Sequence, residues 1–142
     1  MKSFQLKFNN FKKKNNSFEF REQCKLFKLA SFIPELKWMF AVPNGAKRTA
    51  YEGAMLKNSG LKAGVSDIFL PIASSGYHGM FIEMKYGDNK PSQAQKEFIK
   101  DMKIEGYKCI VCYSASEALD SIIKYIKEKR YGNKEKSNFE QV

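Results

Sequence analysis

The sequence predicts a single α/β domain with a central mixed sheet of about four strands, flanked by helices. At 142 residues the chain is long enough to bury one genuine core. Apolar residues recur first at helical spacing and then in short runs, in the order helix, three strands, helix, strand, helix. The first three strands should be antiparallel neighbours, whereas the fourth follows a helical crossover.

The first predicted helix follows Ser17, which can act as its N-cap, and extends to about Ser31. At 100° per residue, Glu19 and Gln23 fall near the middle of a wide apolar arc, and Glu22 falls at its edge. That arc contains Phe20, Cys24, Leu26, Phe27, Leu29, Ala30 and Ile33. Polar side chains in a buried stripe need partners or a function. Alternatively, Glu19 has no partner of this kind and simply occupies the first turn, where an acidic side chain interacts favourably with the helix dipole.

The next predicted elements are a strand at 38–42, a turn at 43–45 and a segment of mixed helical character at 50–58. Lys47 and Arg48 lie between the turn and this segment. An ordinary turn with solvated bases is one interpretation of Lys47 and Lys57, and it accounts less well for Arg48.

Two apolar runs, 68–72 and 80–85, are predicted to form an antiparallel pair of strands. Asp67 stands at the head of the first run, and Glu83 and Lys85 lie on the second. Since successive strand side chains point to opposite faces, Glu83 and Lys85 share one face. The second run is otherwise apolar on both faces, which favours a central strand in which a charge needs a reason.

If these strands pair, Asp67, Glu83 and Lys85 can converge at one spot. Two carboxylates beside one ammonium are the chemistry of a magnesium-dependent enzyme that cuts phosphodiester bonds. Alternatively, Asp67 is a turn residue after Gly64, and Glu83 and Lys85 form a solvated ion pair. The residues alone leave both interpretations open.

A second long helix is predicted from Pro91–Ser92 to about Glu105. Ser92 and Gln95 fit the capping box, which gives Gln95 a structural role. Gln95 also shares a face with the apolar residues of this helix, the side that is expected to be buried.

The fourth strand is predicted at 107–113, and a last helix follows Ser114. The predicted organisation is a basic flexible arm at 1–16, a globular domain at 17–130 and a polar, disordered tail at 131–142.

The formal net charge of +10 favours a polyanionic partner. No apolar run is as long as a membrane span, and the Lys-rich start lacks the apolar region of a secretory signal. Three cysteines, an odd number, are predicted to be buried structural thiols, which indicates a reduced intracellular compartment. His78, the single histidine, is predicted to be a surface loop residue rather than a ligand.

Taken together, these segments resemble the virus-type replication-repair nuclease domain, VRR-NUC, of the PD-(D/E)xK nuclease superfamily. The resemblance runs in order from about Glu19 to Tyr125. It is carried by Pro43-Asn44-Gly45 with Arg48, Gly64-Val65-Ser66-Asp67, Ile82-Glu83-Met84-Lys85, Ser92 to Gln95, and Gly106-Tyr107. One departure is Ser66, where the family commonly has proline, a residue that shapes the turn.

The resemblance implies a restriction-endonuclease-like fold and a set of site residues. A Mg²⁺ or Mn²⁺ ion would be held by Glu19, Asp67, Glu83 and the backbone carbonyl of Met84, with Lys85 acting on the attacking water. Supporting residues would be Gln23 and Gln95 at water or phosphate, and Asn44, Lys47, Arg48 and Lys57 toward DNA or the metal shell.

The implied function is a metal-dependent, structure-specific DNA endonuclease. Such domains standing alone in phage-like contexts resemble Holliday-junction cutters that work as homodimers, whereas those attached to repair proteins act on flaps. The alternatives are a flap- or single-strand-directed nuclease of the same fold and a non-catalytic nucleic-acid-binding module. An intracellular location, cytoplasmic or nuclear, is expected.

Overall fold

The computed structural model describes residues 17–43 and 49–139, with side chains up to residue 128. A first helix covers residues 17–30. The remaining elements are η1 (Pro34–Leu36), β1 (Phe40–Ala41), α2 (Ala50–Asn58), β2 (Ile68–Leu70), β3 (Met80–Met84), α3 (Gln93–Ile104), β4 (Lys108–Cys112) and α4 (Ala115–Phe139).

The four strands form one mixed sheet in the order β1-β2-β3-β4. β1 and β2 are antiparallel, β2 and β3 are antiparallel, and β3 and β4 are parallel. The predicted α/β class and the mixed four-stranded sheet are therefore confirmed. β1 is shorter than predicted, because Trp38 is 70% exposed and residues 37–38 form a turn after η1.

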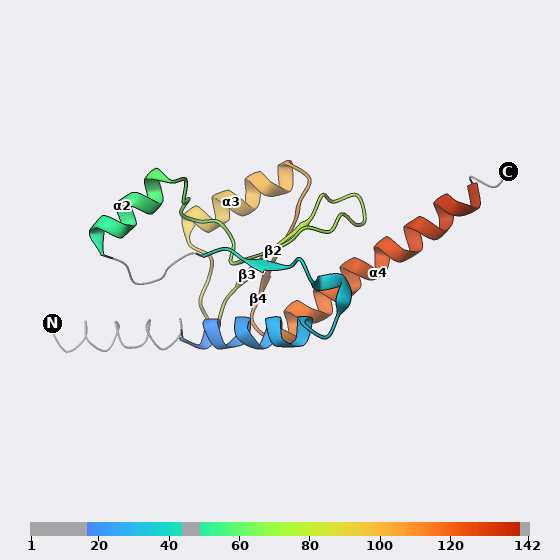
Figure 1. Ribbon diagram of the computed structural model, residues 1–142, viewed down its shortest axis with the longest axis horizontal. Helices are drawn as coiled ribbons and strands as arrows, with labels where there is room; N and C mark the ends of the chain where they lie inside the picture. The colour runs from blue at the N-terminus through green and yellow to red at the C-terminus, as the bar shows by residue number, and fades with distance from the viewer. Residues whose placement is uncertain (1–16, 44–48, 140–142) are drawn as a thin grey trace.

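Helices cover both faces of this sheet. Figure 1 shows α3 on one side, and helix 17–30 together with the first half of α4 on the other. The core contains residues from the central strands, such as Ile68 and Ile82, and from both helices below them, such as Leu26 and Ile122. α2 stands apart in Figure 1 and contains no buried residue.

The buried face of helix 17–30 is narrower than the predicted apolar arc. Leu26 and Ala30 are buried, but Phe20 is 66% exposed, and Leu29 and Cys24 are exposed too. The arc is wider than the surface that the sheet and α4 cover, so its outer members remain in solvent. For Cys24, the prediction of a buried thiol is therefore wrong.

Glu22 joins this helix to α4. Its carboxylate accepts a hydrogen bond from the backbone N–H of Ala115 at 2.9 Å, at the first residue of α4. This contact places a negative charge at a helix N-terminus and lowers the pKa of Glu22, with a further contribution from Lys25. The position of Glu22 at the edge of the apolar arc therefore allows it to act as an anchor between two helices.

α4 continues to Phe139, through most of the segment for which the sequence predicts a disordered tail. None of the helices in the described ranges is long and apolar enough to cross a membrane.

Gly64 fixes the loop before β2 against α3. Its φ is +88°, and a Cβ atom placed on it would lie 2.5 Å from the carbonyl oxygen of Ala94. Only glycine allows this close approach at a positive φ. The loop that carries Asp67 is therefore held directly against the first turn of α3.

We expect Gly64→Ala to lower the free energy of unfolding by more than about 2 kcal/mol, because it combines positive-φ strain with a backbone clash. Gly60→Ala is the matched control: Gly60 has a φ of +103°, but a Cβ atom at this position would have no other atom within 4 Å. It should cost only the conformational strain, about 1 kcal/mol. Urea unfolding followed by circular dichroism measures both, and equal losses would contradict the close packing at Gly64.

Candidate active site

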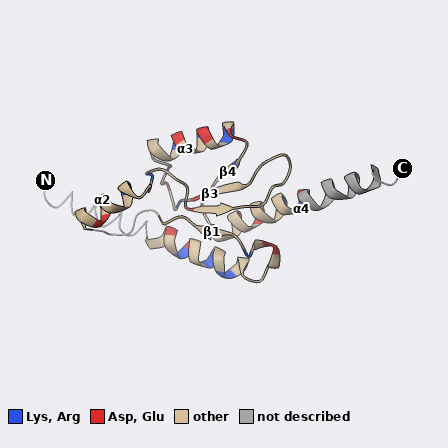
Figure 2. Cartoon of the chain, turned by 45° about the horizontal axis from the view of Figure 1, so that its top comes forward, with Lys and Arg blue, Asp and Glu red and all other residues tan. Residues whose placement is uncertain are grey.

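Glu83 and Lys85 form a buried ion pair at the end of β3. Figure 2 shows that charged residues lie mainly on the helices, so charges on this central strand are exceptional. Glu83 is 0% exposed and Lys85 is 8% exposed. The ammonium of Lys85 donates to Glu83 Oε1 at 2.7 Å. Glu83 and Lys85 therefore lie on one face, as predicted. Their burial shows that the alternative, a solvated ion pair, is wrong.

Asp67 reaches this pair from the neighbouring strand. The antiparallel register that pairs Ile68 with Ile82 brings the residue before β2 alongside the end of β3. There Asp67 Oδ2 accepts a hydrogen bond from the backbone N–H of Met84 at 2.8 Å. A strand residue turns its N–H and C=O to the same side, so the Met84 carbonyl is directed toward Asp67 as well.

Gln95 forms the predicted capping box and also contacts the carboxylate cluster. Its backbone and side chain form the capping box of α3 with Ser92. Its Nε2 also donates to Glu83 Oε1 at 2.5 Å. One side chain therefore starts α3 and holds the buried carboxylate in place.

Glu19 approaches from the opposite face of the sheet. Phe18 stacks on Tyr86 with ring centroids 4.6 Å apart, which attaches the start of helix 17–30 to the chain after β3. The Glu19 carboxylate accepts from Asn89 Nδ2 at 2.9 Å. Its charge contributes to the raised pKa values of Asp67 and Glu83, so it lies within electrostatic reach of both.

The carboxylates of this cluster resist ionisation. Burial raises the pKa of Glu83 to about 7, and the charge of Asp67 adds to this effect, whereas Lys85 opposes it. Burial is also the main cause of the raised pKa of Asp67, which the N–H of Met84 partly offsets. Two neighbouring carboxylates share a single buried ammonium, so the cluster favours a further positive charge.

One oxygen of Glu83 is available to bind such a positive charge. Glu83 Oε2 is buried and has no hydrogen-bond partner within the described structure. A buried carboxylate oxygen without a donor is costly unless a cation or water meets it. The donors Glu83 Oε2, Asp67 and the Met84 carbonyl are hard oxygens, the ligand type that Mg²⁺ prefers.

The predicted three-carboxylate ligand set is not assembled. In the ranges 17–43 and 49–139, no group of three His, Cys, Asp or Glu side chains is close enough to hold a metal ion. Glu19 is held by Asn89 instead of completing such a group. Mg²⁺ commonly uses one or two carboxylates and keeps several waters, so Asp67 and Glu83 with a carbonyl are an adequate set.

The other predicted site residues are less closely tied to the cluster. Gln23 is half-buried one turn after Glu19, and Lys57 is exposed in the last turn of α2. No hydrogen bond in the described part of the chain joins either residue to the carboxylates. Asn44, Lys47 and Arg48 lie outside the described residues.

His78 and the cysteines take no part in the site. His78 is an exposed loop residue whose ring packs edge-on against Tyr107 at 5.7 Å, as predicted. Cys109 is half-buried, Cys112 is buried, and both are free thiols whose pKa values burial raises.

Asn89 is the residue that sequence reasoning missed. It lies in the turn between β3 and α3, where its type is explained by turn formation alone. Its amide nevertheless bridges this turn to Glu19 on a helix 70 positions earlier in the sequence. The only available signal was that an unexplained acid, Glu19, required a donor.

We expect opposite stability changes from two substitutions in this cluster. Asp67→Asn should raise the melting temperature by a few degrees in EDTA, because it removes a charge beside Glu83 and keeps an acceptor for Met84 N–H. Lys85→Met should lower it, since it leaves a buried carboxylate without its cation. Adding Mg²⁺ should then stabilise the wild type more than Asp67→Asn. Shifts of the same sign for both variants would contradict the shared-ammonium arrangement.

Comparison with known proteins agrees with this geometry. The VRR-NUC domain profile matches residues 13–116. A solved structure described as a VRR_NUC domain protein superposes with a TM-score of 0.68 at 29% identity, over 78% of this chain and 88% of that one. No curated protein sequence matches. The matched profile spans the first helix, the whole sheet and the carboxylate cluster, and the chain therefore belongs to the VRR-NUC family of nuclease-type domains.

Proposed function

We propose that this protein is a Mg²⁺- or Mn²⁺-dependent DNA endonuclease that hydrolyses phosphodiester bonds. The observation that supports this most strongly is the cluster of Asp67, Glu83, Lys85 and Gln95, in which one buried carboxylate oxygen has no partner among the described residues. A fold that uses such residues only for stability would gain more from apolar side chains at these positions.

The chemistry requires an attacking water, charge relief on the phosphate and help for the leaving oxygen. A divalent ion held by Asp67, Glu83 and the Met84 carbonyl would supply charge relief and lower the pKa of bound water. Lys85 is held beside Glu83, where its ammonium can orient the water or stabilise the developing negative charge. Gln95 keeps the Glu83 carboxylate in one orientation by donating to Oε1, which leaves Oε2 available to a divalent ion.

The substrate we propose is branched DNA, bound through its backbone. The net charge of +10 favours phosphate contacts that do not read the sequence. A four-way junction of phage or repair DNA needs two symmetric cuts, which a homodimer with two sites supplies. Flap or single-strand cleavage by the same site is the alternative. A non-catalytic binder is disfavoured, because all three central charges are present: Lys85 donates to Glu83, and Asp67 is held beside them by the N–H of Met84.

We expect cleavage only when Mg²⁺ or Mn²⁺ is present and Lys85 is intact. Labelled duplex, single strand, flap and four-way junction should each be incubated with Mg²⁺, Mn²⁺ or EDTA. Lys85→Ala should reduce cleavage by orders of magnitude with little loss of DNA affinity. Preferential symmetric cutting of the junction would support the dimeric proposal, and preferential flap cutting would support the alternative. Undiminished activity in excess EDTA would falsify metal dependence.

Glu19 and Glu22 offer a matched pair for testing the first helix. Glu19→Gln should raise the Mg²⁺ concentration needed for half-maximal cleavage and lower the maximum, because Glu19 contributes negative charge near Asp67 and Glu83. Glu22→Gln should leave the Mg²⁺ dependence unchanged and lower the unfolding free energy by about 1 kcal/mol, since it weakens the contact with Ala115. The reverse pattern would assign the metal-site acid to Glu22.

A further inference from the structure

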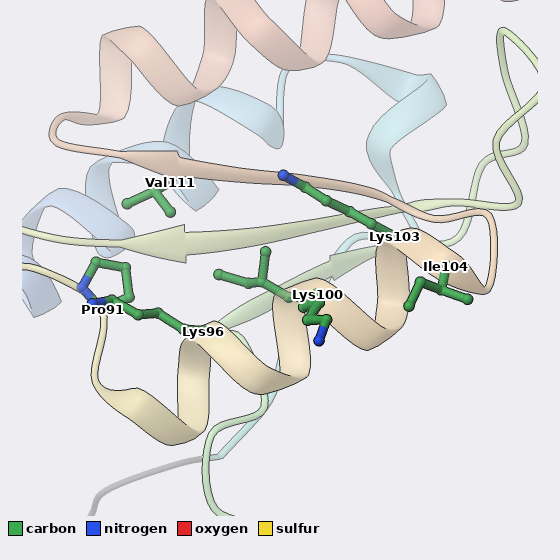
Figure 3. A pocket seen from close by; sticks show the side chains of 7 residues that line it. Pro91, Lys96, Lys100, Lys103, Ile104 and Val111 are labelled. Atoms are coloured by element: carbon green, nitrogen blue, oxygen red, sulfur yellow. The ribbon is translucent and has the colours of Figure 1, made fainter.

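A groove of about 580 Å³ lies between α3 and β4, outside the carboxylate cluster. Its lining combines apolar side chains with three lysines of α3 and contains no acidic residue: Pro91, Lys96, Ile99, Lys100, Lys103, Ile104 and Val111. In Figure 3, Lys96 extends toward Pro91, and Lys103 reaches from α3 across to β4. The groove therefore has an apolar floor and cationic sides, which suits an occupant that is both apolar and anionic.

β4 forms the edge of the sheet along this groove. The N–H of Lys108 bonds to the Gly79 carbonyl, and the carbonyl of Cys112 accepts from Lys85 N–H, so these residues turn toward β3. Because backbone groups alternate in direction along a strand, Cys109 and Val111 direct theirs away from the sheet. Within the described residues no hydrogen bond involves these outward backbone groups.

The exposure of β4 agrees with this position. Four of its five residues are half-exposed, whereas four of the five residues of β3 are buried. The open edge and the groove are continuous at Val111, which belongs to both. An extended chain placed about 4.8 Å from β4 would pair with its backbone and project alternate side chains over α3.

We propose that the groove between α3 and β4 binds an extended acidic peptide segment of a partner protein, which adds to the sheet as a strand next to β4. Acidic side chains of the peptide meet Lys96, Lys100 and Lys103, and apolar ones cover Ile99 and Val111. Nucleic acid satisfies the lysines but offers neither apolar side chains for the floor nor a peptide backbone for the edge. The docking site adjoins the carboxylate cluster, since Val111 pairs with Glu83 across the two strands, but its lining contains none of Asp67, Glu83, Lys85 and Gln95.

The experiment measures fluorescence anisotropy of a labelled, end-capped octapeptide titrated with the full chain. Glutamate and valine take turns at every second position of this peptide and threonine fills the others, so that the glutamates and valines share the face that meets α3. We expect saturable binding to the wild type. The triple variant Lys96→Glu, Lys100→Glu, Lys103→Glu should bind about tenfold or more weakly, because the charges of the three groove lysines are reversed. The matched control, Lys28→Glu, Lys124→Glu, Lys127→Glu, changes the net charge equally at exposed positions elsewhere and should bind within about twofold of the wild type.

A second probe tests backbone pairing without any protein variant. The same peptide, N-methylated at alternate residues so that it cannot donate to β4, should lose most of its affinity. Equal binding of both peptides, equal binding by both triple variants, or no binding by the wild type would each overturn the proposal. Evidence that the groove binds DNA or a second copy of the chain would also overturn the proposal. A DNA path would appear as oligonucleotide affinity lost selectively in the first triple variant, and a second copy as a selective change in sedimentation.

Discussion

The structure depends on a carboxylate that has no access to solvent. Glu83 is 0% exposed in the central strand β3, where an unpaired charge would cost several kcal/mol. Lys85 and Gln95 both bond to one of its oxygens, and the other has no partner within the described structure. The raised pKa of Glu83 shows that these donors do not fully offset burial and the neighbouring Asp67. The two carboxylates are balanced by only one ammonium, that of Lys85, so the cluster has the composition of a cation-binding site.

The sheet topology is what brings the partners of Glu83 together. The antiparallel step from β2 delivers Asp67 to the end of β3, and the crossover to the parallel strand β4 begins with α3 beside the same point. Gln95 can reach Glu83 because α3 starts there, and Gly64 lets the Asp67 loop approach Ala94 closely. A glycine, a capping box and a strand register thus act on one site.

Helix 17–30 contacts both α4 and the turn after β3 through two acids that are one turn apart. Glu22 anchors the N-terminus of α4, and Glu19 reaches Asn89 in the turn after β3. The same helix therefore contributes to the support of the C-terminal helix and to the negative potential at the carboxylates. On the other face of the sheet, α3 connects the site at its first turn with the lysine-lined groove along its length.

The sequence by itself determined the α/β class, the antiparallel pairing of the central strands and the face that Glu83 and Lys85 share, whereas it left open whether Asp67 meets them. These follow from local periodicity, because strand alternation alone decides which side chains share a face. It also indicated the capping role of Gln95 from the pattern Ser-x-x-Gln, whereas a place for Gln95 at the cluster was implied only by the family resemblance. Only the tertiary structure decided which acid of the first helix anchors α4, which apolar residues remain exposed and which donor meets Glu19. Those outcomes depend on how much of a helix its neighbours cover and on contacts between segments 70 or more positions apart, such as Asn89 with Glu19 and Ala115 with Glu22, which no local pattern encodes.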